Sequence, residues 1–169
     1  MEDIMFWPQV AQSVAGISYR RLDNWSKPGG FVEPKQAETG EVRFYSFSQI
    51  IALTVVGHLR RIGLDTATCH LFCEAILKLP ELESMVTAES CTQWLIYDGN
   101  SIGSQPLDNI LFDDAELLNV PVARAFVVVP LRHFARLVGK RVDEAMNEEV
   151  DRQRKRMATL REKAEIKKA

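Results

Sequence analysis

Apolar residues in the first half of the chain recur at helical spacing, and glycine and proline interrupt them. Helices are therefore predicted over residues 8–15, 18–27, 46–63 and 65–79. Between the second and third of these helices, Phe31-Val32 and Glu41 to Tyr45 are predicted to form two short strands around a polar, turn-rich segment. Two short helices joined by a glycine turn, a strand pair and two further helices indicate a winged helix-turn-helix.

The pattern changes after Pro80, where short apolar runs replace the helical spacing. Strands are predicted at residues 93–97, 109–112 and 125–129, with a turn at 98–100, a returning strand at 101–104 and an acidic helix near 113–118. From Leu131 an apolar stripe predicts one long helix, and the stripe thins after Val150. The expected fold is mainly α with small β elements. A winged helix-turn-helix domain at residues 1–79 precedes a small α/β module at 80–169 that ends in a long C-terminal helix.

The second predicted helix has two chemically different faces. Ser18 is a suitable N-cap residue, and Leu22 and Trp25 lie three apart on an apolar face. The other face carries mostly polar residues, namely Tyr19, Arg20, Asp23, Asn24 and Lys27. Arginine and asparagine can pair with base edges in the major groove, and tyrosine can hold a phosphate. By itself, this pattern also fits an ordinary amphipathic helix at the surface of a protein.

Composition and charge narrow the possible functions. The chain has 169 residues, with 46% hydrophobic and 26% charged residues, which is typical of globular proteins. Residues 64–122 carry 1 basic and 10 acidic residues, whereas residues 1–63 have a net charge of +1 and residues 123–169 one of +6. A strongly acidic middle cannot face a nucleic acid. Three cysteines and an N-terminus without a signal peptide or membrane span predict a cytoplasmic protein.

A series of short segments through the first half occurs in a characteristic order. The segments are Val10-Ala11, Gly16-Ile17-Ser18, Leu22, Trp25, Gly30-Phe31-Val32, Pro34, Arg43-Phe44-Tyr45-Ser46 and Leu59-Arg60-Arg61-Ile62-Gly63-Leu64. In this order they closely resemble the N-terminal DNA-binding domain of MerR-family transcriptional regulators, over about residues 8–79. The resemblance fades after residue 80, so it implies nothing about an effector.

The resemblance implies which residues contact DNA. In that family the reading helix enters the major groove, and the wing contacts the flanking backbone. The implied contacts, with two further polar residues of the same helix, are Ser18, Tyr19, Arg20, Asn24, Lys27, Arg43 and Tyr45. Asp23 departs from the family, which often has arginine there. An acidic group at this position removes a phosphate contact and could accept a hydrogen bond from a cytosine amine.

Candidate chemistry elsewhere in the chain is sparse. Cys69 and Cys73 lie four apart on one face of a predicted helix, and Cys91 is the third cysteine. Such cysteines could sense a metal, but the spacing is generic and buried structural cysteines in an apolar helix are common, so we favour a structural role. No phosphate-binding, dinucleotide-binding or nucleophile motif occurs, so we expect no enzyme, no cofactor and no metal site.

These observations predict a sequence-specific regulator of transcription that binds double-stranded DNA. It is expected to bind an inverted-repeat site as a homodimer through the C-terminal helix, and any small-molecule effector is unknown. The stripe from Leu131 to Val150 could instead pack on its own strand module. Two other functions remain open: a phage or plasmid DNA-packaging or excision protein, and a protein–protein adaptor that uses the winged domain.

Overall fold

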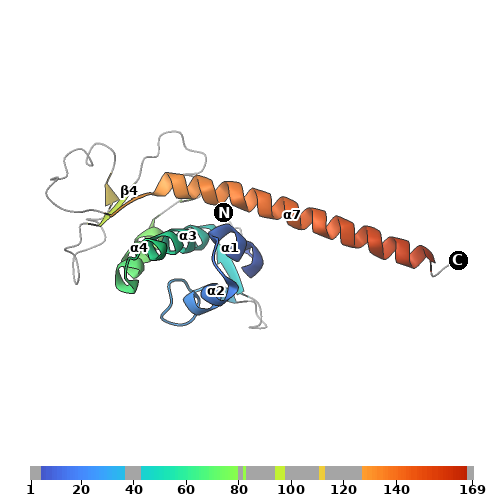
Figure 1. Cartoon of the computed structure of the whole chain (residues 1–169), viewed down its shortest axis with the longest axis horizontal. Helices are drawn as coiled ribbons and strands as arrows, with labels where there is room; N and C mark the ends of the chain where they lie inside the picture. The colour runs from blue at the N-terminus through green and yellow to red at the C-terminus, as the bar shows by residue number, and fades with distance from the viewer. Residues whose placement is uncertain are drawn as a thin grey trace.

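The chain folds into a body of short helices and a small sheet, with one long helix along the body. The computed structural model describes residues 5–36, 43–79, 82, 94–97, 111–112 and 127–166. The elements in chain order are β1 (Met5–Phe6), α1 (Pro8–Ala15), α2 (Tyr19–Trp25), β2 (Lys35–Gln36), β3 (Arg43–Ser46), α3 (Phe47–Arg61), α4 (Thr66–Lys78), β4 (Trp94–Tyr97), β5 (Leu111–Phe112), β6 (Val127–Pro130) and α7 (Leu131–Ile166). Helix α7 projects far beyond the body at its C-terminal end (Figure 1).

Side-chain caps define where the helices of the body begin. The Ser46 hydroxyl accepts a hydrogen bond from the Gln49 amide at 3.3 Å, and the Gln49 side chain accepts one from the Ser46 amide at 3.0 Å. This reciprocal capping box starts α3. Asp65 caps α4 by accepting from the Thr68 amide at 2.9 Å. The helices predicted to begin at these two positions are therefore confirmed.

The first sheet is the wing, and it differs in detail from the sequence prediction. Its strand order is β1-β3-β2, and both pairings are antiparallel. The prediction of a strand at Phe31 and Val32 is wrong. The Val32 amide donates to the Trp25 carbonyl at 3.1 Å, which folds this segment back onto α2 and buries both side chains. Pairing with β3 therefore begins later, at Lys35 opposite Phe44.

The second sheet has the order β5-β4-β6, with antiparallel pairing. Its strands overlap the three predicted strand regions but are shorter, and β6 ends at Pro130, one residue beyond the predicted region. The predicted turn at 98–100, the returning strand at 101–104 and the acidic helix near 113–118 lie outside the described residues. Among the residues that the structure describes, β4 pairs with β5 and β6, and both are distant from it in sequence.

One apolar core joins the body to the first half of α7. The α3 residues at its centre are almost completely buried, including Ile50, Ile51, Leu53, Val55 and Val56. Helix α7 packs on α1 and α3, where Leu131, Ala135 and Val138 are fully buried. The rings of His58 on α3 and Phe134 on α7 meet edge to face, 5.2 Å apart. Packing on the same chain therefore covers the first part of the apolar stripe of α7, which contains Leu131, Ala135 and Val138 and is called the proximal stripe. This corrects the expectation that the stripe is free to contact a second copy.

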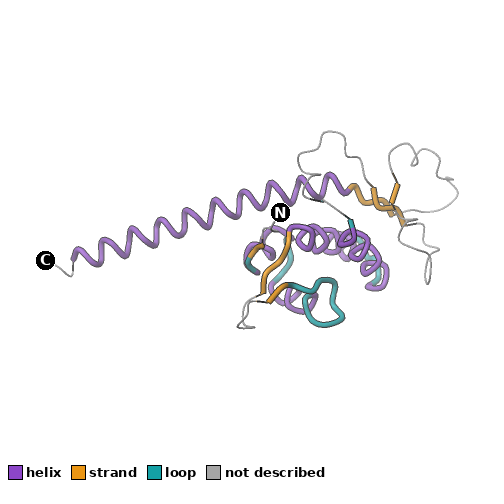
Figure 2. The backbone as a smooth tube through the Cα atoms, turned by 180° about the vertical axis from the view of Figure 1, so that it is seen from behind, coloured by secondary structure: helices purple, strands orange, loops and turns teal. Residues whose placement is uncertain are grey.

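Helices α2 and α7 lie on opposite sides of the body, with α3 between them (Figure 2). The core is continuous across residue 79, and the boundary between two domains at that residue stays a prediction. Among the helices that the structure describes, none is long and apolar enough to cross a membrane.

Candidate nucleic-acid interface

A tight turn sets the direction in which α2 leaves α1. Gly16 ends α1 in the left-handed region, with φ of 63°, and its amide donates to the Ser13 carbonyl at 3.2 Å. Ser18 then caps α2, because its hydroxyl accepts from the Arg21 amide at 3.3 Å. The Ser18 side chain therefore orders the start of α2 rather than projecting freely from it.

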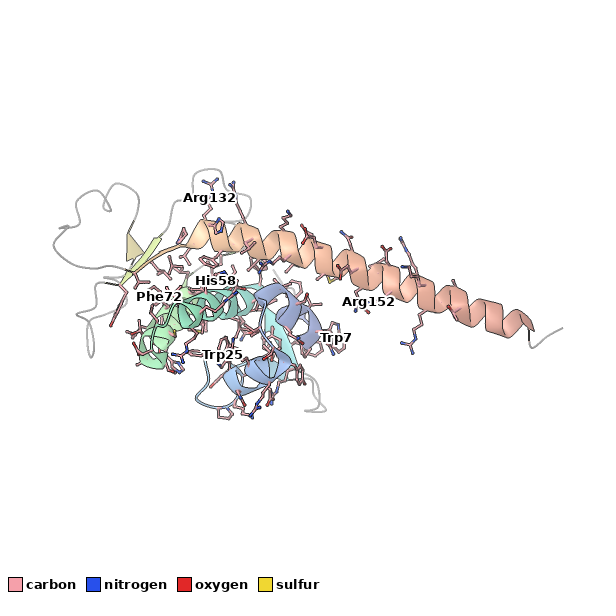
Figure 3. The ribbon with its side chains drawn as sticks, in the orientation of Figure 1. Trp7, Trp25, His58, Phe72, Arg132 and Arg152 are labelled. Atoms are coloured by element: carbon pink, nitrogen blue, oxygen red, sulfur yellow. The ribbon has the colours of Figure 1, made fainter. Side chains whose placement is uncertain are left out.

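The two faces of α2 are separated as the sequence predicted. Leu22 is 1% exposed in the core, and Trp25 is half-buried with its ring edge-on to Phe31 at 5.2 Å (Figure 3). On the outer face Tyr19 is 60% exposed, and Arg20 and Asn24 are exposed beside it. The outer face of α2 therefore carries aromatic, cationic and amide groups that are open to solvent.

A short loop after α2 requires glycine at one position because of a close approach. A Cβ atom on Gly30 would lie 2.4 Å from the Trp25 carbonyl oxygen and 2.9 Å from that of Lys27. The Gly30 amide donates to the Lys27 carbonyl at 2.7 Å, which closes the turn. This loop returns the chain from α2 toward β2 and so places the wing beside the reading helix.

The two predicted wing contacts have different environments. The Arg43 side chain is 32% exposed and lies 3.0 Å from Asp23 on α2. Tyr45 is 1% exposed, and its hydroxyl lies 3.0 Å from the Ser26 hydroxyl inside the core. The expectation of a DNA contact from the Tyr45 side chain is corrected by this burial, because a buried ring cannot reach a phosphate.

Residues 9–76 match the sequence model of the MerR HTH family regulatory protein. Over these residues, called the MerR domain below, the chain is similar to the MerR helix-turn-helix family. The match spans α1, α2, the wing, α3 and most of α4, which are the elements that the geometry brings together around α2. At the level of this family, the match supports a DNA-binding regulator of transcription. A comparison with curated proteins found no match.

Within this MerR domain, Asp23 joins the reading helix to the wing. Its carboxylate oxygens lie 3.0 Å from Lys27 Nζ and 3.0 Å from Arg43 Nη1. The hydrogen bond from Lys27 is the main cause that holds the pKa of Asp23 below its usual value, and Arg43 lowers that pKa further. Asp23 is therefore ionised at neutral pH and partly neutralises two of the cations expected to meet DNA.

Three further exposed residues lie on α2 and on or next to the strands of the wing, and sequence patterns do not single them out. Arg21 is exposed on α2 next to Arg20, and the two adjacent arginines in the sequence could have indicated it as a DNA contact. Lys35 is exposed on β2, and it was missed because the wing strand was expected four residues earlier. Trp7 is 54% exposed and packs against Phe44 at 4.9 Å between ring centres (Figure 3).

The cysteines on α4 of the MerR domain are packed into its core. Cys69 is fully buried and Cys73 is 1% exposed. The Cys73 thiol donates to the Phe31 carbonyl at 2.8 Å, and burial raises its pKa to about 12. A neutral thiol bound to a carbonyl is a poor metal ligand, because metals bind the thiolate. Among the described residues no three potential ligands cluster, and Cys91 lies outside them.

Proposed function

We propose that the protein regulates transcription by binding a specific inverted-repeat sequence in double-stranded DNA as a two-fold homodimer. The observation that carries this proposal is the geometry of α2. Leu22 anchors the helix in the core, while Tyr19, Arg20 and Asn24 are exposed to solvent. Helix α2 itself lies on the side of the body away from α7 (Figure 1). An α-helix presented in this way fits the width of the major groove.

The side chains on the outer face of α2 suit two kinds of contact. Arg20 and Asn24 lie four residues apart, on the same side of the helix. Arginine pairs with the O6 and N7 of guanine, and asparagine pairs with the N6 and N7 of adenine. Tyr19 and Arg21 lie beside them and are suited to phosphates, which fix the position of the helix without reading sequence.

The wing supplies phosphate contacts on one side of α2. Lys35 is exposed on β2, and Arg43 is partly exposed on β3, directly beside Asp23 of α2. Two cations next to a reading helix favour binding to the backbone that flanks the groove. Lys27, which is 53% exposed just beyond the end of α2, extends the same cationic surface.

A single module of this size contacts few base pairs, so we propose that a second copy completes the site. The distal part of α7, residues 146–166, extends over roughly 31 Å at 1.5 Å per residue. Its described side chains include large apolar groups in solvent: Met146 is 47% exposed, Val150 44% and Met157 54%. These residues follow one another by four and seven positions, which is the spacing of a helix-pairing seam.

The charge pattern of α7 favours an antiparallel second copy as the partner. Residues 143–151 contain five acidic and no basic residues, whereas residues 152–168 contain eight basic and two acidic residues. In an antiparallel pair the acidic stretch of one copy faces the basic stretch of the other. A parallel pair would place like charges side by side. The antiparallel arrangement also carries the two reading helices to opposite ends of the assembly, as an inverted repeat requires.

Selection from a random pool of DNA duplexes tests the proposal. The unmodified protein should enrich an inverted repeat whose half-sites are separated by about one helical turn or a multiple of it. Arg20→Ala should lose about 1–3 kcal/mol of specific binding, concentrated at one base pair in each half-site. Arg136→Ala is the matched control, because it removes an exposed arginine from α7 on the opposite side of the body.

Each alternative function gives a different result in this experiment. A protein–protein adaptor would bind no duplex at any salt concentration, because it lacks the electrostatic attraction to phosphates. A DNA-packaging or excision protein would bind DNA, but fragments selected from the source genome would come from phage ends or attachment sites. Either result would contradict a role in transcription.

A further inference from the structure

Two polar residues on α2, one in the turn that follows it and one on β3 form a connected cluster around Asp23. Asp23 Oδ1 accepts from Arg43 Nη1 at 3.0 Å, and Asp23 Oδ2 lies 3.0 Å from Lys27 Nζ. The same ammonium group donates to Asn24 Oδ1 at 3.1 Å. We call Asp23, Asn24, Lys27 and Arg43 the Asp23 cluster. It links the reading helix to the wing, and through Lys27 it reaches the amide of a proposed base-reading residue.

The Asp23 cluster lies at the surface rather than in the core. The exposed fractions of the side chains are 38% for Asp23, 32% for Arg43 and 53% for Lys27. Surface ion pairs of this kind contribute little to the stability of a fold. The hydrogen bonds of Ser26 and Val32 already hold the wing side of the domain to α2 from within. A role in stability alone therefore accounts poorly for an acidic group in the middle of a cationic surface.

We propose that Asp23 is a specificity-determining residue that acts by positioning its neighbours: it holds Lys27 and Arg43 away from arbitrary phosphates and keeps the Asn24 amide oriented. This inference rests on the proposed DNA-binding function. It assigns Asp23 no direct contact with a base, because each carboxylate oxygen already binds a cation of the same chain.

The electrostatic consequence can be stated as a count of charges. Lys27, Arg43 and Asp23 together carry a net charge of +1, whereas the two cations without Asp23 would carry +2. Each cation that binds a phosphate releases counterions and steepens the dependence of affinity on salt. At 0.15 M salt one such contact strengthens binding to any sequence by roughly fivefold. Asp23 therefore weakens the electrostatic part of binding, which supplies essentially all of the nonspecific affinity.

The orientation of Asn24 gives the second consequence. An asparagine side chain must present its oxygen and its NH₂ group together to read adenine. Lys27 holds the Asn24 oxygen, and Asp23 holds Lys27, so the amide is ordered before DNA arrives. Without Asp23 the ammonium group and the amide are free to rotate. Discrimination between bases then falls at the position that Asn24 reads.

The test compares three variants of the full chain on random duplex DNA and on the selected site, at several salt concentrations. Asp23→Asn should raise affinity for random duplex about fivefold for each cation released, steepen the salt dependence and reduce the ratio of specific to nonspecific affinity. Arg43→Gln breaks the same ion pair but should lower affinity for random duplex, because it removes a cation. In the double variant the affinity for random duplex should return close to that of the unmodified protein, because the net charge is restored, whereas discrimination at the position that Asn24 reads should stay reduced.

The opposite signs of the two single variants make the test decisive. If Asp23 had only a structural role, both variants would weaken binding, and that result would overturn the proposal. A loss of cytosine preference at a single position in Asp23→Asn would also overturn it, since it would show direct base reading. Glu74→Gln is the control, because it releases Lys78 from an equivalent pair on α4 and should leave DNA binding unchanged.

A measurement without DNA separates this inference from the proposed function. Acetylation of lysines by dilute acetic anhydride, followed by peptide mass spectrometry, should modify Lys27 faster in Asp23→Asn than in the unmodified protein. Lys78 serves as the internal reference. Unchanged reactivity of Lys27 would show that the Asp23 cluster does not form and would overturn the inference. If the unmodified protein bound no DNA, the proposed function and the specificity role would fall together, while the lysine data would still report the cluster.

Discussion

The hydroxyl groups of Ser26 and Tyr45 lie 3.0 Å apart in the core, where the end of α2 meets the middle of β3. Both residues are buried, with exposed fractions of 7% and 1%. A hydrogen bond between two buried hydroxyls leaves each of them satisfied only while the other is present. The pair therefore fixes the reading helix to the wing from inside, beneath the surface cluster around Asp23.

Tyr45→Phe should lower the free energy of unfolding by about 1–3 kcal/mol, because it leaves the Ser26 hydroxyl buried without a partner. Adding Ser26→Ala should recover part of this loss, since both polar groups are then absent. Denaturant unfolding of the three variants measures the effect. If Tyr45→Phe weakened DNA binding with unchanged stability, the Tyr45 hydroxyl would be a DNA contact after all.

Gly30 should not tolerate alanine, because the added Cβ would meet the Trp25 carbonyl at 2.4 Å. We expect Gly30→Ala to cost about 1–3 kcal/mol of stability, as an overpacked site does. Gly29→Asn is the matched control. Gly29 has φ of 77° with nothing within 4 Å of an added Cβ, and asparagine enters this region readily. Equal losses in urea unfolding would mean that the loop is not closely packed on α2.

The sequence predicted the helices of the body well because their signals are local. Ser18, Ser46 and Asp65 each cap the helix that follows them, and apolar spacing defines the buried faces. The positions of Phe31 and Tyr45 could not be predicted in this way. Both depend on contacts with residues distant in sequence, Phe31 with Cys73 and Tyr45 with Ser26. Pattern alone cannot distinguish a buried loop residue from a strand residue.

The candidate site shows the same division. The outer face of α2 follows from helical spacing, so Tyr19, Arg20 and Asn24 are exposed as expected. The ion pair between Asp23 and Arg43 joins residues twenty positions apart and required the wing to be placed correctly. On α7, the spacing of the apolar residues fits both packing on the body and pairing with a second copy, so the sequence could not distinguish the two. The structure shows that the stripe divides, with Val142 8% exposed and Met146 47% exposed.

Cys73 should be inert in the folded protein. Its pKa is about 12, raised from an ordinary 9.0 by burial, so the thiol is neutral at pH 8. We expect iodoacetamide to modify Cys73 only as fast as the protein unfolds, as measured by mass spectrometry of its peptide. Modification in the native state at the rate of an exposed thiol would contradict the packing of α4 on Phe31.

The same pKa implies a dependence of stability on pH. Because the folded state binds the Cys73 proton more tightly than the unfolded state, its contribution is complete below pH 9.0 and is lost as pH rises toward about 12. The free energy of unfolding then falls by up to about 1.4 kcal/mol for each pH unit. Unfolding of the unmodified protein and of Cys73→Ala at pH 8 and pH 10 isolates this group. Identical pH dependence in the two proteins would be evidence against a buried thiol.

The two halves of the α7 stripe should respond differently to a charge. Val138 is completely buried against the body, whereas Val150 is 44% exposed on the projecting part of the helix. Val138→Asp places a carboxylate in an apolar core without a partner, so it should unfold the domain rather than separate two copies. Val150→Asp should leave the melting temperature of the body nearly unchanged, yet yield monomers with much weaker DNA binding, because two modules then lose their mutual tether. Light scattering at micromolar concentration and thermal melting measure the two effects together. If Val138→Asp gave a folded monomer, the dimer contact would lie on the buried first part of the stripe. If Val150→Asp stayed dimeric, the exposed part of the stripe would not be the dimer contact.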